Sequence, residues 1–148
     1  MIKQEILNAC LLIIEEKIAI AQKLMDAAQA AANEEGKSSA GDKYETGRAM
    51  AQIERDKSAH RLAEAIKAKA LLLNVPITKK QHKVALGSLV TTDLGRFFFA
   101  VALGKIEIKG DEYFIISPIS PLGQELLNKN AGDKVSVNGR SYLIKTIE

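Results

Sequence analysis

The sequence predicts an α+β protein in which an antiparallel helical hairpin precedes a small antiparallel sheet domain with one short helix. Three observations support this fold class. Apolar residues follow a helical period up to about residue 73, short alternating segments follow Asn74-Val75-Pro76, and the two parts differ in charge. We therefore expect a coiled-coil arm over residues 1–75 and a globular domain over residues 76–148.

The first predicted helix runs from Ile2 to about Ala32. One row of apolar side chains is spaced alternately by four and three residues, which is the heptad pattern of helices that pack side by side. The members of this row are Leu7, Leu11, Ile14, Ile18, Ala21, Met25, Ala28 and Ala32. A second row beside it contains Ile6, Cys10, Ile13, Ile20, Leu24, Ala27 and Ala31.

A polar break is predicted from Asn33 to Tyr44, where glycine and serine are frequent. A second helix then continues to about Leu73, with a weaker apolar row formed by Met50, Ile53, Ala59, Leu62, Ala63, Ile66, Ala70 and Leu73. Two long helices joined by a short polar segment indicate an antiparallel hairpin with its tip near residues 33–45. With about 30 residues in each helix, the arm would be roughly 45 Å long.

The second part of the chain predicts short strands over residues 84–91, 96–103, 107–108, 113–116, 134–137 and 141–147. Gly110-Asp111 and Asn138-Gly139 indicate hairpin turns, because these residue types tolerate positive φ. A short helix over residues 121–128 fits Ser120 as its N-cap and proline at its first position. These elements predict an antiparallel sheet accompanied by one helix.

Composition and charge narrow the possible functions. Residues 1–73 carry 11 basic and 11 acidic side chains and residues 74–148 carry 10 and 7, so the net charge of +3 belongs to the second part. Aromatic residues make up only 5% and Trp is absent, which disfavours a protein that binds nucleic acid by stacking on bases. A single cysteine, Cys10, fits a reducing compartment, and no apolar run has the length that a membrane span needs. We therefore expect a cytoplasmic protein without a membrane partner.

The sequence carries no conventional catalytic or metal motif. One cysteine and two separated histidines, His60 and His82, exclude a structural zinc site. A phosphate-binding glycine loop, a dinucleotide fingerprint and a nucleophile elbow are all missing from the sequence. We interpret His60 as a packed or half-exposed helix residue, and we expect a protein that is not an independent enzyme.

Acidic residues gather at the predicted tip, where Asp42 and Glu45 are three residues apart at the start of the second helix. This spacing matches a capping box, in which the aspartate accepts hydrogen bonds from backbone N–H groups and the glutamate reaches back. The alternative is that the two carboxylates carry Mg²⁺ into a site of another protein, because Mg²⁺ takes one or two carboxylates together with water and phosphate oxygens. Spacing alone favours the cap.

Three segments resemble the Gre family of bacterial transcript-cleavage factors. The run Ile116-Ser117-Pro118-Ile119-Ser120-Pro121-Leu122-Gly123, with Ala131-Gly132-Asp133 after it, resembles the end of those proteins. The run Val84-Ala85-Leu86-Gly87-Ser88-Leu89-Val90 is similar to the start of their globular domain, and Gly41-Asp42-Lys43-Tyr44-Glu45 is similar to their tip motif Gly-Asp-x-x-Glu. The resemblance covers nearly the whole chain, in the right order.

The resemblance implies an FKBP-like globular domain that docks on the rim of the secondary channel of bacterial RNA polymerase, while the arm enters the channel. Asp42 and Glu45 would hold a Mg²⁺ shared with the polymerase, which would cleave backtracked RNA in its own active site. No cofactor would be bound stably. The docking surface would include Ser117, Pro118, Ser120, Pro121, Leu122 and Gly123. The same segment could instead be only a loop and a helix cap, and we expect part of it to be structural and part to line the docking surface. The protein would be a monomer that contacts nucleic acid only within the transcription complex.

Three alternatives remain open at this stage. The tip motif is followed by Thr46-Gly47-Arg48-Ala49, where the family has Asn and then an Ala-Glu-Tyr stretch, so the protein could bind the channel without stimulating cleavage. A peptidyl-prolyl isomerase is suggested by the FKBP-like domain, but Phe97, Phe98 and Phe99 are consecutive and should alternate between core and edge packing. A plain oligomerisation module would use the heptads in a parallel coiled coil without the polar break.

Overall fold

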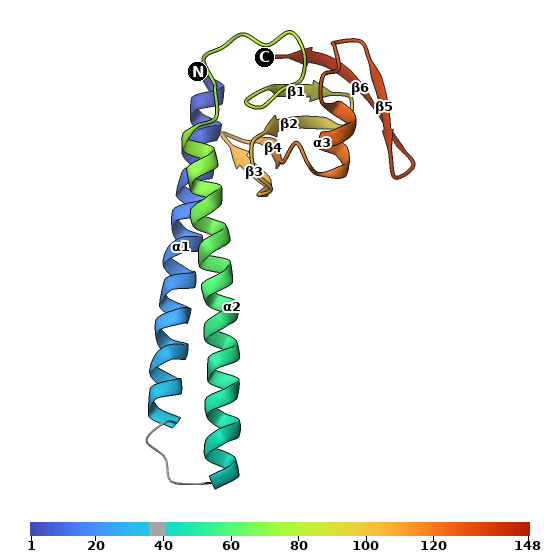
Figure 1. Cartoon of the computed structure of the whole chain (residues 1–148). Helices are drawn as coiled ribbons and strands as arrows, with labels where there is room; N and C mark the ends of the chain where they lie inside the picture. Colours follow the sequence, from blue (N-terminus) through green and yellow to red (C-terminus); the bar gives the residue numbers. More distant parts are fainter. Residues whose placement is uncertain (36–40) are drawn as a thin grey trace. The chain divides into compact units, whose positions relative to one another are not determined.

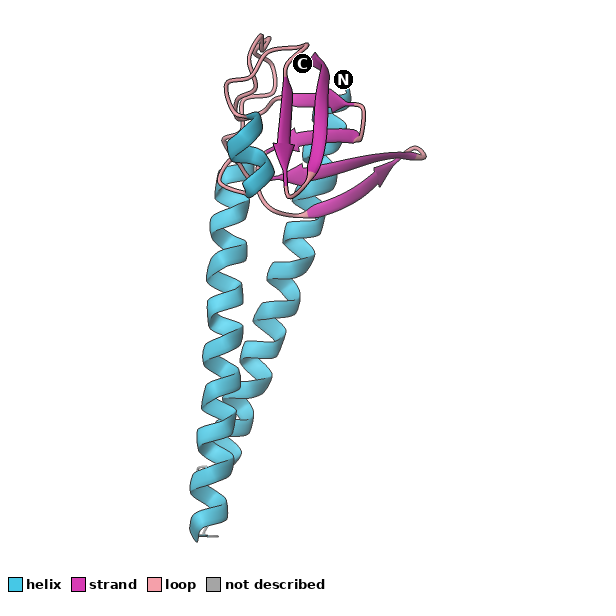
Figure 2. Cartoon of the chain, turned by 90° about the vertical axis from the view of Figure 1, so that its right-hand side faces the viewer, coloured by secondary structure: helices cyan, strands magenta, loops and turns pink. Residues whose placement is uncertain are grey.

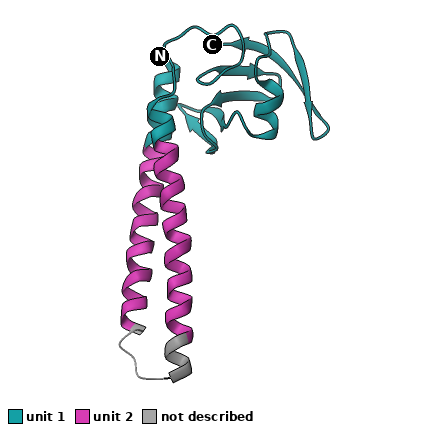
Figure 3. Ribbon diagram, in the orientation of Figure 1, with its two compact units in different colours: residues 1–11, 70–148 teal, residues 12–69 magenta. Residues whose placement is uncertain are grey.

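The structure is a computed structural model that describes the backbone of residues 1–35 and 41–148 and the side chains of residues 1–34 and 46–148. Two long helices come first, and strands with one short helix follow (Figure 1). Residues 12–69 form one compact unit, and residues 1–11 with residues 70–148 form the other (Figure 3). The predicted α+β class is confirmed.

The first helix, α1, spans Ile2–Glu35 and the second, α2, spans Gly41–Leu73. The predicted break from Asn33 to Tyr44 is therefore too wide at both ends, because α1 continues to Glu35 and α2 already begins at Gly41. The two helices contain 34 and 33 residues. Each is thus about 50 Å long. Within the described residues, none of the helices combines the length and apolarity needed to cross a membrane.

Two side-chain contacts within residues 12–69 show that α1 and α2 are antiparallel. Lys69 Nζ lies 3.6 Å from a carboxylate oxygen of Glu15, and Arg55 Nη1 donates to Gln29 Oε1 over 3.3 Å. Gln29 lies 14 residues after Glu15, whereas Arg55 lies 14 residues before Lys69. The two contacts are thus separated by the same two heptads in opposite directions, as the predicted hairpin requires.

The heptad row predicted for α1 forms its packed face. All eight side chains from Leu7 to Ala32 in this row are buried or half-buried. The second row behaves differently, because Ile20, Leu24, Ala27 and Ala31 are all exposed. Beyond the first turns of α1, only the first apolar row therefore lies on the packed face.

The apolar row predicted for α2 is wrong in its main members, because Met50 and Ile66 are 64% and 52% exposed. Among the described side chains of α2, residues 46–73, the buried ones are instead Ser58, Ala65 and Leu72, which follow one another at intervals of seven residues. Two of these three, Ser58 and Ala65, are small, and the larger residues Met50, Ile53 and Ile66 are exposed. The prediction from sequence selected large apolar residues and missed the seven-residue spacing of the buried positions.

Six strands form one sheet in the order β3-β4-β2-β1-β6-β5 (Figures 1 and 2). The strands are β1 (Leu89–Thr92), β2 (Gly95–Phe99), β3 (Gly104–Ile108), β4 (Asp111–Ile116), β5 (Lys134–Val137) and β6 (Arg140–Ile147). Helix α3 (Pro121–Leu126) connects β4 to β5. The predicted bounds of β5 agree at both ends, those of β3, β4 and β6 agree at the second end, and β1 starts later and β2 ends earlier than predicted.

The sheet is mixed, which corrects the prediction of a purely antiparallel one. Strands β2 and β4 are parallel, with Phe97 opposite Phe114, and the other neighbouring pairs are antiparallel. The parallel pair arises because β3 runs back along the edge and β4 inserts between β3 and β2. Strand β3 therefore serves as the crossover that a parallel pair needs.

Both predicted hairpins are present, and one of them turns a residue earlier than expected. Asn138 and Gly139 have φ of 51° and 79°, which suits a two-residue turn with positive φ at both positions. In the other hairpin the turn residues are Lys109 and Gly110, with φ of 53° and 86°, and Asp111 already pairs with Ile108. The prediction of Gly110-Asp111 as the turn is wrong because a lysine takes the left-handed position.

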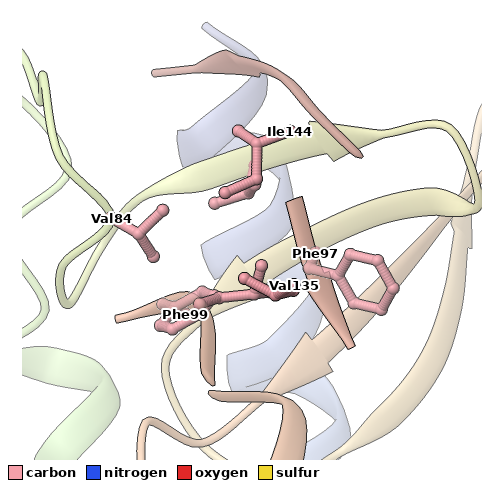
Figure 4. Close-up of a cluster of buried hydrophobic side chains, with 7 residues drawn as sticks. Val84, Phe97, Phe99, Val135 and Ile144 are labelled. Atoms are coloured by element: carbon pink, nitrogen blue, oxygen red, sulfur yellow. The ribbon is translucent and has the colours of Figure 1, made fainter. Parts of the chain in front are cut away.

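The middle of the sheet, formed by β1 and the end of β2, is buried on both faces. On one face Val84, Val90, Phe97, Phe99, Leu126, Val135 and Ile144 form a cluster, part of which is labelled in Figure 4. Phe98 points to the other face and is fully buried, as are Ile6 and Cys10 from the first turns of α1, which lie behind the strands in Figure 4. All three phenylalanines are buried in an internal strand, so the core part of the predicted packing is confirmed and the edge part is wrong.

Candidate functional site

The two acidic residues of the tip, Asp42 and Glu45, lie outside the described side chains. Their predicted roles, either as Mg²⁺ ligands or as a helix cap, therefore stay predictions. Within residues 1–34 and 46–148, no group of three or more His, Cys, Asp or Glu side chains is placed to hold a metal ion.

The second candidate site, the loop from Ser117 to Gly123, is closely hydrogen-bonded. Ser120 Oγ donates to the carbonyl oxygen of Ser117 over 2.7 Å and accepts from the N–H of Gly123 over 3.1 Å. The N–H of Ser120 also donates to the Ser117 carbonyl over 3.0 Å. Ser120 is thus the N-cap of α3, as predicted, and it closes the loop at the same time.

A close backbone approach fixes the other end of this loop. An added Cβ at Gly123 would lie 2.1 Å from the carbonyl oxygen of Ser117 and 2.8 Å from Ser120 Oγ. Only glycine leaves room for this approach, although its backbone is helical. Gly123 therefore brings the start of α3 against the residues that precede it.

The structure divides the predicted docking residues into two groups. Ser117, Ser120 and Gly123 hold the loop together, and Leu122 packs against the core cluster. Pro121 is exposed and Pro118 is half-buried, so these two present apolar surface to the outside. The docking role of all six residues stays a prediction.

One residue of the loop, Ile119, was not among the predicted docking residues, yet it has the highest exposed fraction of the exposed large apolar side chains in the described residues. Ile119 is 80% exposed, between two segments that are fixed by hydrogen bonds. An apolar residue just before an N-cap commonly packs against the fourth residue of the helix. That residue here is Gln124, whose side-chain amide donates to the carbonyl oxygen of Ile119 over 2.9 Å. The glutamine at this position is the sequence signal that could have revealed Ile119 as unpacked.

The single cysteine does not form a reactive site. Cys10 is fully buried, and burial raises the pKa of its thiol to about 11. A thiol with so high a pKa is almost entirely protonated at neutral pH and is a poor nucleophile. His60 is exposed on α2, which corrects the expectation that it would be packed or half-exposed.

One ion pair joins the first turns of α1 to the turn between β3 and β4. Lys109 Nζ lies 2.8 Å from Glu5 Oε1. The hydrogen bond and the charge of Lys109 lower the pKa of Glu5, and the same two effects of Glu5 raise the pKa of Lys109. Both side chains reach solvent, so this pair orients the helix end more than it stabilises the fold.

These features define a protein with an antiparallel helical hairpin and a mixed sheet domain that presents a rigid loop before a capped helix. Residues 79–148, which include every strand and α3, match the model of the C-terminal family of the transcription elongation factors GreA/GreB. Residues 79–148 thus form a domain of the GreA/GreB C-terminal family, which confirms the resemblance seen in the sequence for this part of the chain. No curated protein sequence matches the chain.

Proposed function

We propose that the protein binds bacterial RNA polymerase through its secondary channel and stimulates the polymerase's own cleavage of backtracked RNA. The GreA/GreB match over residues 79–148 is the observation that carries this proposal. The hairpin adds support, because two antiparallel helices of about 50 Å each would give the long reach that a channel requires. The sheet domain, of the FKBP-like type in this proposal, docks on the channel rim, and the protein acts as a cytoplasmic monomer.

In this proposal the chain brings carboxylates and supplies no catalytic nucleophile of its own. Asp42 and Glu45 are the residues that would hold Mg²⁺, because a pair of carboxylates is a donor set that this ion accepts when water and phosphate oxygens complete its coordination. When bound, the metal would activate water and stabilise the charge that develops during phosphodiester hydrolysis. The protein would then be an accessory factor, and the polymerase would be the enzyme.

A second candidate function is that of a Gre-like regulator that binds the channel without stimulating cleavage. The observation that favours it is the run Thr46-Gly47-Arg48-Ala49, which differs from the family's residues beside the two tip acids. In this case Asp42 and Glu45 would serve as a helix cap. The two functions share the binding site and differ only in the chemistry at the tip.

The test is RNA cleavage in backtracked elongation complexes assembled with the polymerase of the source bacterium. The wild type is compared with Asp42→Asn and Glu45→Gln, and with Glu16→Gln as a matched control, because Glu16 is an exposed carboxylate of α1 far from the tip in sequence. Binding to the polymerase is measured for every variant by competition with a labelled wild-type chain.

The proposal predicts shortened RNA with the wild type and the Glu16 variant, and little or none with the two tip variants, although all four chains bind. Binding without cleavage by the wild type would establish the regulator instead. A wild type that does not bind the polymerase would refute both functions.

A further inference from the structure

The loop between β4 and α3 presents a large apolar side chain, Ile119, to solvent. Of the exposed large apolar side chains in the described part of the chain, Ile119 has the highest exposed fraction, at 80%. Scattered apolar residues on a surface are ordinary and need no explanation. Ile119 differs from them because the backbone on both of its sides is held in place.

Hydrogen bonds fix the backbone of Ile119 at each of its polar groups. Its N–H donates to Ser117 Oγ over 3.3 Å, and its carbonyl oxygen accepts from the Gln124 side chain over 2.9 Å. The residues around it are closed by the bonds between Ser120 and Ser117, and the rings of Pro118 and Pro121 restrict φ on either side. The loop therefore holds the isoleucine outward without needing any contact from its side chain.

The usual intramolecular partner of such a side chain is missing. In a hydrophobic staple, the residue before the N-cap packs on an apolar residue at the fourth helix position, and this position holds Gln124. Leu122, which is the nearest other apolar residue of α3, packs instead against the core cluster. Within the described residues, Ile119 is thus left as an apolar projection with exposed Pro121 beside it.

We propose that Ile119 is an apolar anchor that inserts into an apolar pocket on the surface of RNA polymerase. This inference rests on the proposed function, because it takes the polymerase as the partner of the sheet domain. An anchor of this kind binds with a small loss of conformational entropy, because its backbone is already fixed and its side chain has few rotamers. Buried anchors at the centre of an interface commonly dominate its affinity. The polymerase pocket should accept a branched aliphatic side chain and have polar groups at its rim, where Gln124 and Glu125 are exposed.

The experiment measures the affinity and dissociation rate of the full-length chain for RNA polymerase. The variants are Ile119→Ala, which removes the anchor, Ile119→Val, which keeps a branched side chain, and the matched control Leu94→Ala. Leu94 is 51% exposed in the turn between β1 and β2 of the same unit. All variants should unfold at the wild-type temperature, since these side chains are largely in solvent.

We expect Ile119→Ala to bind about tenfold more weakly, mainly through faster dissociation, whereas Ile119→Val and Leu94→Ala stay close to the wild type. Wild-type affinity in Ile119→Ala would overturn the anchor and leave the proposed function intact. A wild type that fails to bind would defeat the proposed function and the anchor together. Sedimentation that shows a wild-type dimer lost in Ile119→Ala would assign the side chain to a second copy and overturn the polymerase as its partner.

Discussion

Replacing Gly123 with alanine tests whether the loop from Ser117 to Gly123 depends on a close backbone approach. The new Cβ would lie 2.1 Å from the Ser117 carbonyl oxygen and 3.0 Å from Pro118 Cα, so the loop must move away from α3. That movement separates Ser120 from the groups that it bonds at both ends. Forced overpacking typically costs about 1–3 kcal/mol, and the loss of an N-cap adds about 1 kcal/mol.

An opposing effect must be subtracted, because alanine is favoured over glycine in a helix by about 1 kcal/mol. The clash and the lost cap together exceed this gain. We therefore expect Gly123→Ala to lower the free energy of unfolding of the sheet domain by about 1–3 kcal/mol. Ser120→Ala should cost about 1 kcal/mol by itself, and the double variant should lose less than the two single losses combined because both changes break the same cap.

The assay is urea denaturation followed by near-ultraviolet circular dichroism of tyrosine. The chain has no Trp, and Tyr113 and Tyr142 lie in the sheet, so a Tyr44→Phe background makes the signal specific for this domain. Gly132→Ala is the control, since it places a Cβ in open space at a φ of +94° and carries only backbone strain. A Gly123→Ala domain as stable as the wild type, or more stable, would refute the reasoning.

Three further predictions concern the packing around the sheet. Cys10 should react with a thiol reagent at pH 8 far more slowly in the folded protein than in guanidinium, because burial raises its pKa to about 11; equal rates would contradict this. Glu5→Gln should lower the free energy of unfolding slightly at neutral pH, as measured in urea. Because the pKa of Glu5 is lowered, the stability difference between the wild type and Glu5→Gln should disappear as the pH falls through that pKa. Because the pKa of Lys109 is raised, the difference should also disappear at strongly alkaline pH. A stability difference that grows in acid would contradict this prediction. Phe98→Ala should cost about 3–5 kcal/mol in the same assay, and a loss below about 1 kcal/mol would show that its burial is not tight.

The sequence was most informative where large side chains and periodic spacing coincide. In α1 the heptad row contains Leu7, Ile14 and other bulky residues, so its packed face could be identified correctly. In α2 the packed positions hold Ser58 and Ala65, whose small size makes them indistinguishable from surface residues in a list of apolar positions. Close helix packing favours small residues, so this face becomes visible only when the partner helix is present.

The loop before α3 shows the same limit at the candidate site. Ser120 as a cap and Pro121 at the first helical position follow from local chemistry, and the structure confirms the cap. The approach of Gly123 to Ser117 depends on the path of the backbone in three dimensions, which no local pattern specifies. The exposure of Ile119 could be predicted only with the knowledge that the Gln124 side chain bonds to the Ile119 backbone and offers no apolar contact.

The equal spacing of the two contacts between α1 and α2 limits how the length of the hairpin can vary. Removing residues from α1 alone would shift Gln29 away from Arg55 while Glu15 stays opposite Lys69. Within residues 15–29 and 55–69, a change that keeps both contacts and the heptad spacing must therefore delete or insert a whole heptad in each helix at once, so 14 residues change together. Each such step alters the hairpin by about 10 Å. Among relatives of this protein, the length of the hairpin should accordingly differ in steps of one heptad per helix.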